Sequence, residues 1–154
     1  MCAPINTAPA HKKSGEDQAI GHSRGGPSTK IHALVDALGN PVAFDLTGGE
    51  AHDLVGADHL LPAMQADTLI GDKAFDAGWL RERLAGDGIE AVIPMREGTT
   101  GHPAHDAEKY KWRHLVENFF CAIKAFRRIA TRYEKTDTCF AAMINIVAVV
   151  LWTR

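Results

Sequence analysis

Apolar residues occupy every second position in two neighbouring segments, residues 29–37 and 42–47. An alternation with a period of two places the apolar side chains on one face of a β-strand. The dipeptide Gly39-Asn40 lies between the two segments and is typical of a hairpin turn. The pattern therefore predicts a β-hairpin. Residues 1–28 sustain neither this period nor the helical one, so an irregular N-terminal arm is predicted there.

The next part of the chain changes between helical and strand-like spacing. Residues 52–64 carry apolar side chains at the spacing of a helix, and residues 67–75 contain a short apolar core that predicts a central strand ending at Asp72. Asp76 is the predicted N-cap of a second helix, and residues 90–94 predict another short strand. Strands that alternate with helices after an antiparallel hairpin imply an α/β fold, in which helices flank a mixed sheet.

Residues 107–131 predict a long amphipathic helix, and residues 138–152 predict a final apolar one. At about 100° per residue, one face of the long helix is apolar: Trp112, Leu115, Val116, Phe119, Ile123 and Phe126. The opposite stripe is polar and carries Tyr110, Arg113, Glu117, Lys124 and Arg128. The tryptophans of the chain fall at apolar helical positions, which predicts that they pack in the core: Trp79, Trp112 and Trp152.

The polar stripe has two interpretations. It is either a solvated face, in which Arg113 and Glu117 form an i,i+4 ion pair, or a metal-binding carboxylate beside cations that hold phosphates. The net charge of −2 counts against a nucleic-acid partner, but the charge is unevenly distributed. Residues 109–135 contain eight basic and two acidic residues, whereas residues 36–108 contain four basic and fourteen acidic ones. The basic segment either balances its acidic neighbour or binds DNA phosphates.

Composition narrows the class of protein. The length of 154 residues and the 45% hydrophobic content suit one compact domain. No basic, apolar leader opens the chain, and the apolar run of residues 140–152 is shorter than the roughly 20 residues that cross a bilayer. A cytoplasmic protein without a membrane partner is therefore expected. The three cysteines are far apart and do not form a C-x-x-C motif, which argues against disulfides and a thiolate metal site.

The spacing Tyr110-x2-Arg113-x3-Glu117-x6-Lys124 matches the Y-x2-R-x3-E-x6-K signature at every position. In this respect the chain resembles the bacterial insertion-sequence DDE transposases of the insertion sequence four-like and five-like kind. Further segments look like that family and extend the resemblance from about residue 11 to the end: residues 24–32, 46–49, 70–73 and 126–133.

The resemblance implies an RNase H-like fold over residues 29–154, with three carboxylates that bind two Mg²⁺ ions. By position, Asp72 is the second carboxylate and Glu117 the third, and both are implied metal ligands. Tyr110, Arg113 and Lys124 are implied to act with them at the catalytic site. The residues expected to contact DNA are Arg24, Lys30, His114, Arg127, Arg128 and Arg132. The implied activity is cleavage of DNA at transposon ends and strand transfer into target DNA, by a nucleoid-associated homodimer.

One departure from the family pattern concerns the first carboxylate. The resemblance implies an Asp on an initial strand just before Lys12-Lys13, yet residues 1–15 contain no Asp or Glu. We therefore expect a truncated domain that lacks its first strand and is a weak or inactive nuclease alone. The alternative is a non-catalytic remnant that binds DNA or dimerises.

Overall fold

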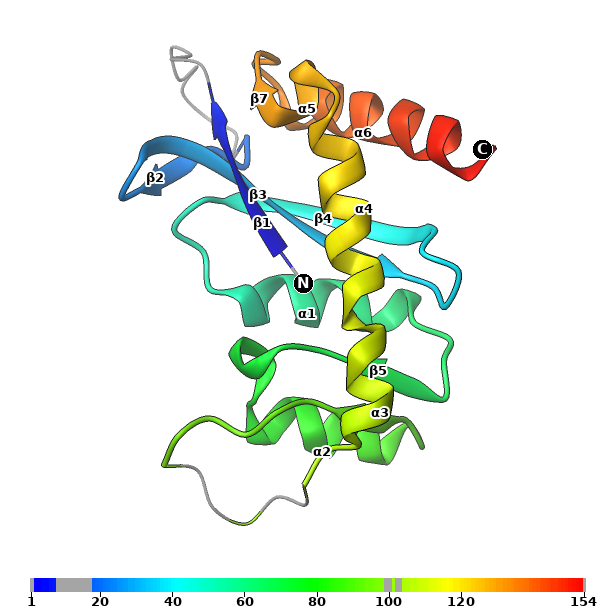
Figure 1. Ribbon diagram of the computed structural model, residues 1–154. Helices are drawn as coiled ribbons and strands as arrows, with labels where there is room; N and C mark the ends of the chain where they lie inside the picture. Colours follow the sequence, from blue (N-terminus) through cyan, green and yellow to red (C-terminus); the bar gives the residue numbers. More distant parts are fainter. Residues whose placement is uncertain (1, 8–17, 99–100, 102–103, 154) are drawn as a thin grey trace.

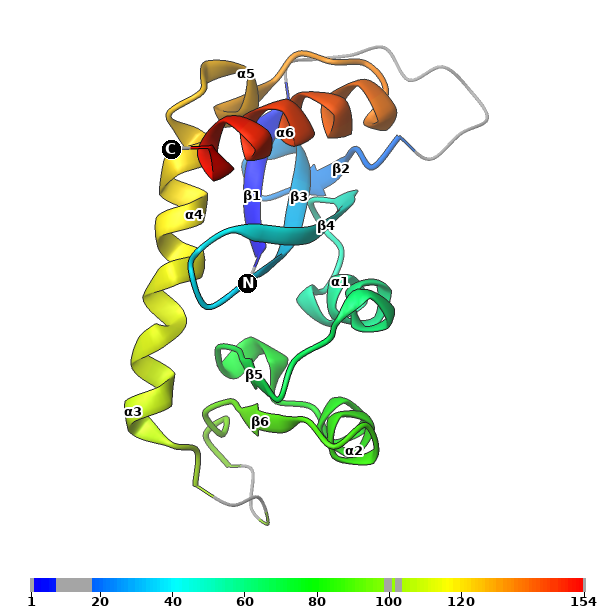
Figure 2. The same ribbon diagram turned by 90° about the vertical axis from the view of Figure 1, so that its right-hand side faces the viewer.

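The computed structural model describes residues 2–7, 18–98, 101 and 104–153, and within them it contains two sheets flanked by helices (Figures 1 and 2). The larger sheet has the strand order β2-β3-β1-β7, with β4 also paired to β3. Its strands are β1 (Cys2–Thr7), β2 (Gly21–Ser23), β3 (Gly26–Val35), β4 (Pro41–Gly48) and β7 (Thr131–Arg132). The smaller sheet pairs β5 (Thr68–Ile70) with β6 (Glu90–Val92). The predicted mixed α/β architecture is thus confirmed at this level.

The predicted hairpin is present as β3 and β4, which pair in antiparallel register from Thr29↔Gly48 to Leu34↔Ala43 before a bulge. Its turn is fixed by Asp36, whose carboxylate accepts the backbone N–H groups of Leu38 and Asn40, both at 2.8 Å. Gly39 has a φ of 90°, a conformation that glycine adopts without a Cβ penalty. The local turn chemistry therefore explains why this element was predictable.

The predicted irregular arm over residues 1–28 is wrong in part, because Cys2–Thr7 form the strand β1 between β3 and β7. β1 pairs antiparallel to β3 from Cys2↔His32 to Asn6↔Ser28, and parallel to β7 at Asn6↔Thr131. The expectation that no strand precedes the hairpin is wrong for the same reason. All partners of β1 are distant in sequence, and a proline within it argues locally against an inner strand, so tertiary pairing decided the outcome.

The larger sheet packs against the C-terminal helices, and this contact forms the main core. α4 (His114–Lys124) runs across the sheet, and α5 (Arg127–Ala130) and α6 (Asp137–Trp152) lie at its end (Figures 1 and 2). The buried members of this core are Ile5, Ile31, Ala33, Phe119, Phe120, Ile123, Ile129, Phe140, Ile144 and Val147. Within the described part of the chain, no helix is long and apolar enough to span a membrane.

The smaller sheet has its own core, and this contradicts the prediction of a central strand at residues 67–75. β5 pairs in parallel with β6 alone among the described strands. α2 (Gly78–Gly86) covers the pair and contributes Leu80 and Leu84 to a core completed by Phe75 and Ile93. α1 (Asp53–Leu60) and a 3-10 turn, η1 (Leu61–Ala63), connect the two sheets, as the helix predicted over residues 52–64.

Asp76 does not cap α2 as predicted, because Ala77 holds the N-cap position. The Asp76 side chain is buried and forms an ion pair with Arg81 at 2.9 Å. It also accepts the backbone N–H of Arg96 at 2.8 Å. The carboxylate thus ties α2 to the chain that follows β6, a contact that no local pattern indicates.

The predicted long helix over residues 107–131 is divided into shorter ones. α3 (Ala107–Tyr110), the 3-10 turn η3 (Lys111–Arg113) and α4 follow one another, but α4 ends at Lys124. Phe126 has extended dihedral angles, φ −85° and ψ 112°, which redirect the chain so that Ile129 enters the main core. The helical periodicity on which the prediction was based therefore ends at Lys124. Arg128 consequently does not lie on the same polar face as Glu117.

The tryptophans are not in the core, which contradicts their predicted role. Trp79, Trp112 and Trp152 are 42%, 54% and 63% exposed. Trp79 and Trp152 lie on helices whose buried faces are formed by other apolar side chains, and Trp112 lies in the turn η3, which contains no buried residue.

Gly56 of α1 lies against the buried ring of His32, and this close approach predicts a steric requirement for glycine. A Cβ at this position would lie 2.0 Å from His32 Cγ. The ring is held by Thr47, 2.8 Å from its Nε2. We expect Gly56→Ala to lower the free energy of unfolding by about 2 kcal/mol, measured by urea denaturation. Gly86→Ala is the control, because no atom lies within 4 Å of the added Cβ. Equal stability of both variants would contradict this contact.

Candidate functional site

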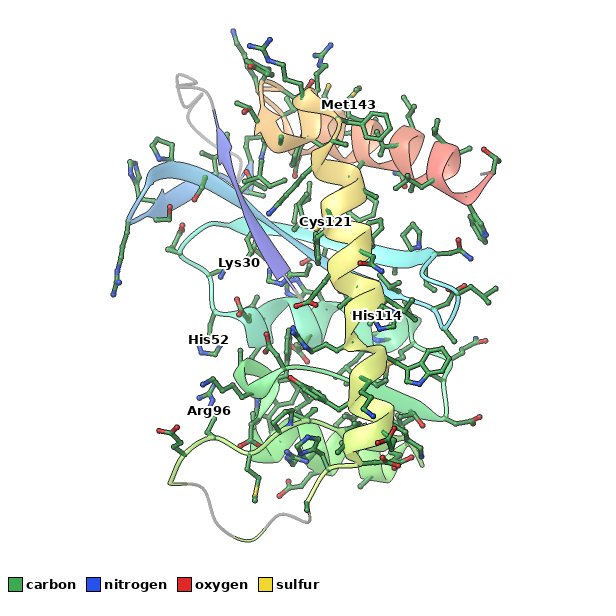
Figure 3. All side chains as sticks on the ribbon, viewed as in Figure 1. Lys30, His52, Arg96, His114, Cys121 and Met143 are labelled. Atoms are coloured by element: carbon green, nitrogen blue, oxygen red, sulfur yellow. The ribbon has the colours of Figure 1, made fainter. Side chains whose placement is uncertain are left out.

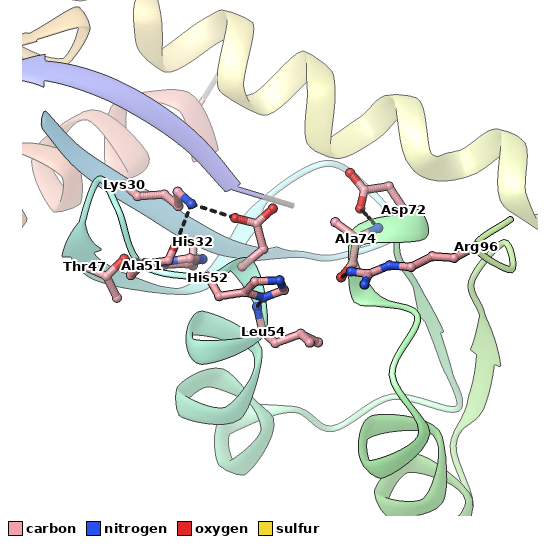
Figure 4. A network of polar contacts seen from close by, with 10 residues as sticks. Lys30, His32, Thr47, Ala51, His52, Leu54, Asp72, Ala74 and Arg96 are labelled. Carbon is pink, nitrogen blue, oxygen red and sulfur yellow. Dashed lines mark hydrogen bonds and ion pairs between the residues drawn. The ribbon is translucent and has the colours of Figure 1, made fainter. Parts of the chain in front are cut away.

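Asp72 lies just beyond the C-terminal end of β5, as the sequence predicted. Its carboxylate accepts the backbone N–H of Ala74 at 2.8 Å and thereby starts the 3-10 turn η2 (Lys73–Phe75). Figure 4 shows this carboxylate on the side of the turn that faces the long helical segment. The side chain is half-buried, so the turn fixes it without closing it off from solvent.

Glu117 lies in the first turn of α4 and is paired within its own helical segment. Arg113 Nη2 lies 2.6 Å from Glu117 Oε1, and the Glu117 side chain is 46% exposed. The guanidinium of Arg113 also stacks over the ring of Tyr110, 5.7 Å from its centroid. The predicted group of Tyr110, Arg113 and Glu117 is therefore brought together, whereas Lys124 is exposed two turns further along α4.

The elements that carry Asp72 and Glu117 face each other across a cavity of about 530 Å³. Ile70 at the end of β5 lines one wall, and Arg113 and Val116 line another. Among the described residues, however, no group of three or more His, Cys, Asp or Glu side chains is arranged to hold a metal ion. Two carboxylates, each already bonded to a protein donor, do not fit a site for a pair of divalent cations.

Lys30, which Figure 4 shows to one side of Asp72, forms a polar contact with Asp53. Lys30 Nζ donates to Asp53 Oδ1 at 2.8 Å and to the carbonyl oxygen of Ala51 at 2.6 Å. The side chain of Lys30, predicted to contact DNA, is therefore half-buried and used to hold the start of α1. Asp53 was not among the predicted site residues, because its partner Lys30 lies too far away in sequence to be inferred from spacing.

Arg96 is a residue near this site that the sequence analysis missed (Figures 3 and 4). Its side chain donates to the carbonyl oxygens of Lys73 and Ala74, at 3.0 Å and 2.8 Å. These are the residues that follow Asp72, so Arg96 holds the turn that fixes the carboxylate. The only sequence signal is an arginine after a predicted strand.

The other residues predicted to contact DNA lie at several places on the surface. Arg24 is exposed at the turn between β2 and β3. His114 is exposed on α4, where its Nδ1 lies 2.8 Å from the carbonyl oxygen of Lys111 (Figure 3). Arg127 and Arg128 are exposed on α5, and Arg128 is paired with Glu134 at 2.6 Å. Arg127 and Arg128 therefore lie together on α5, whereas His114 lies at the opposite end of α4 and Arg24 at a separate turn.

Arg132 is buried, which contradicts its predicted contact with DNA. It is 1% exposed, and its Nη1 donates to Thr29 Oγ1 at 2.7 Å. The guanidinium lies 5.1 Å from the ring centroid of Phe140. Burial lowers the pKa of Arg132, although the charges of Asp137 and Glu134 raise it. The side chain is part of the core that joins β7, β3 and α6.

The sequence matches a family model over residues 5–152, and that model is described as the transposase DDE domain. The chain belongs to the DDE transposase family. This match includes the second half of β1, from Ile5, as well as the residues of the signature in α3, η3 and α4. The predicted family is thereby confirmed.

Two relatives agree with membership of the DDE transposase family. A Brucella ovis protein assigned as the transposase for insertion sequence element IS6501 is 36% identical over 129 residues, which cover 82% of this chain and 99% of the relative. A Burkholderia cepacia protein assigned as the transposase for insertion sequence element IS402 is 27% identical over 135 residues, covering 80% of this chain but 62% of the relative. No solved structure gives a significant match.

Proposed function

We propose that this chain binds DNA for an insertion-sequence transposase, at transposon ends and at the target, but does not cut DNA by itself. Its membership of the transposase family supports the first part. The acidic groups support the second, because residues 1–15 contain no Asp or Glu and the described residues contain no metal-binding group of three. The lack of such a group of three among the described residues is the observation that carries the proposal.

The proposed domain is RNase H-like and includes β1 and β2 in addition to residues 29–154. The order of elements supports this assignment. Three antiparallel strands, β1, β3 and β4, precede α1, and the parallel strands β5 and β6 enclose α2. Asp72 and Glu117 are proposed to contribute one carboxylate each to an incomplete Mg²⁺ site, because carboxylate oxygens are its preferred protein ligands, but they do not by themselves hold a pair of these ions. A third ligand, supplied by another polypeptide, would be required for metal-dependent strand cleavage and transfer.

The proposed DNA-binding surface consists of Lys124, Arg127 and Arg128, where α4 ends and α5 begins. The three side chains are exposed, and Lys124 and Arg127 have no carboxylate partner among the described residues. Exposed cations bind DNA mainly by neutralising phosphates, so the binding is expected to depend on salt rather than on sequence. The alternative function is that of a non-catalytic remnant that binds DNA or forms a homodimer. The same basic surface would bind the DNA in that case.

The double variant Lys124→Glu/Arg127→Glu is expected to weaken binding of a fluorescent DNA duplex at least tenfold at low salt. Removing two phosphate contacts should also reduce the slope of log K against log salt by about 2. Arg83→Glu is the matched control, because Arg83 is exposed on α2 and pairs with Asp87. Fluorescence anisotropy measures each affinity. If the double variant and the control bind equally, this surface does not contact DNA.

Plasmid nicking tests the proposed loss of cleavage. The purified chain is expected not to nick supercoiled DNA in Mg²⁺ or Mn²⁺. Asp72→Ala and Glu117→Ala are expected to bind DNA as the parent does, because both carboxylates lie outside the basic surface. Metal-dependent nicking that is abolished in both variants would overturn the proposal. It would show that the chain itself contains a complete cleavage site that includes Asp72 and Glu117. DNA binding that is indifferent to metal and to both variants agrees with it.

A further inference from the structure

The outer face of α6 is an uncharged surface that no described element covers. We call it the α6 stripe, and its members are exposed and lie three or four positions apart along the helix: Cys139, Ala142, Ile146, Val149 and Thr153. The opposite face of α6, with Phe140, Ile144 and Val147, is buried in the main core. The stripe extends along the whole helix, over about 24 Å.

The α6 stripe lacks the charged side chains that an exposed helix face normally carries. Residues 138–153 contain no Asp, Glu, Lys or Arg, so α6 has no charged face toward water. Ile146 and Val149 are 58% and 59% exposed, and Trp152 beside them is 63% exposed. Figures 1 and 2 show α6 at the outer end of the molecule. An exposed apolar surface of this kind typically marks a contact with another protein.

The spacing and the sizes of these side chains match a second copy of the same helix. Alternate steps of three and four residues are the spacing at which two helices pair. The stripe begins with the small Cys139 and Ala142 and continues with the larger Ile146 and Val149. An antiparallel pair centred on Ile146 would place Ala142 opposite the partner's Val149, so that a small side chain faces a larger one. A parallel pair would place large against large and leave a gap at the small end.

The exposed area of this face is sufficient for a small specific interface. From the exposure of the stripe and of Val150 and Trp152 beside it, each copy would bury roughly 600 Å², and a pair about 1,200 Å², the lower limit for specific interfaces. A twofold pair uses the same surface on both copies, so a self-complementary stripe needs no second kind of protein. A strongly charged partner such as DNA would meet no opposite charge on it.

We propose that two copies of this chain associate through their α6 stripes as an antiparallel helix pair. The antiparallel arrangement also opposes the dipoles of the two helices. The pair would present the basic surface of Lys124, Arg127 and Arg128 twice, once on each copy. The proposal goes beyond DNA binding and does not rest on it, because assembly is measured in the absence of DNA.

Light scattering over a range of protein concentrations measures the assembly. The parent chain is expected to form a dimer, and Val149→Glu is expected to weaken it at least tenfold, because it places a charge in the apolar contact. Val55→Glu is the control, the same change at an exposed position of α1 outside the stripe. Circular dichroism confirms that both variants fold. A parent that stays monomeric overturns the proposal, and so does a dimer that Val149→Glu leaves intact.

Cross-linking with a short bismaleimide tests the antiparallel arrangement, in a chain with Cys2→Ser and Cys121→Ser. Thr153→Cys in this chain is expected to yield covalent dimers on a denaturing gel, because positions 139 and 153 of the two copies lie opposite each other. Adding Cys139→Ser gives the control, which is expected to remain unlinked because the two copies of position 153 lie at opposite ends of the pair. Dimers linked through Cys139 alone, without Thr153→Cys, would contradict the antiparallel arrangement.

Discussion

Arg132→Ala is expected to lower the free energy of unfolding by about 3 kcal/mol or more, measured by guanidinium denaturation. The substitution removes a buried guanidinium that donates to Thr29 Oγ1 at 2.7 Å and to the carbonyl oxygen of Glu134 at 3.1 Å. It also leaves a cavity beside the ring of Phe140. The lost contacts link β7, β3 and α6, so no local rearrangement restores them.

Two further variants divide this effect into its parts. Arg132→Met keeps most of the hydrocarbon volume and is expected to recover the packing against Phe140 but not the hydrogen bonds. Arg127→Ala, at an exposed position of α5, is expected to change stability by less than about 0.5 kcal/mol. If Arg132→Ala were as stable as Arg127→Ala, the buried guanidinium would not stabilise the fold. The predicted contact of Arg132 with DNA would then be the better interpretation.

Acidification is expected to destabilise the protein by about 3 kcal/mol through His32 alone. Burial lowers the pKa of this side chain from 6.5 to about 4, an effect that the nearby charge of Asp45 only partly opposes. The ring is 2% exposed, its Nε2 lies 2.8 Å from Thr47 Oγ1, and its Nδ1 has no partner among the described residues. The unfolded chain therefore binds a proton more readily than the folded one. The contribution is complete above about pH 6.5 and is lost as the pH falls to about 4.

Urea denaturation at half-unit intervals between pH 4 and pH 7 measures this dependence. Many carboxylates also titrate at the acidic end, so the informative quantity is the difference between the parent and His32→Gln. The variant should lose the slope of about 1.4 kcal/mol per pH unit that one proton contributes. His59→Gln is the control, because His59 is exposed and paired with Asp45. An unchanged slope in His32→Gln would rule out this residue as the cause.

The parts of the fold that the sequence predicted are those determined by near neighbours in the chain. The β3–β4 hairpin depends on period-two alternation and on Asp36, which bonds to residues two and four positions away. β1 was missed because its partners, β3 and β7, are distant in sequence. The end of α4 was missed because no glycine or proline marks it, and packing of Ile129 in the main core redirects the chain instead.

The same distinction applies to the candidate site. Tyr110, Arg113 and Glu117 were expected to lie together, and helical spacing alone is sufficient to bring them into contact. The contacts of Arg96 with Lys73 and Ala74 cross more than twenty residues and have no local signature. Whether a charged residue is buried is equally a matter of tertiary pairing, which is why Arg132 was grouped with exposed cations.

The position of β1 has a consequence for the order in which the chain folds. Its ladder with β7 joins Asn6 to Thr131, so nearly the whole chain must be synthesised before that edge is satisfied. The β5–α2–β6 unit, in contrast, closes within a short stretch of sequence and carries its own core. Since contacts between distant residues form slowly, the nascent protein holds its first strand half-paired until its last quarter leaves the ribosome. During synthesis this interior strand is therefore a temporary sheet edge, exposed to aggregation with other chains.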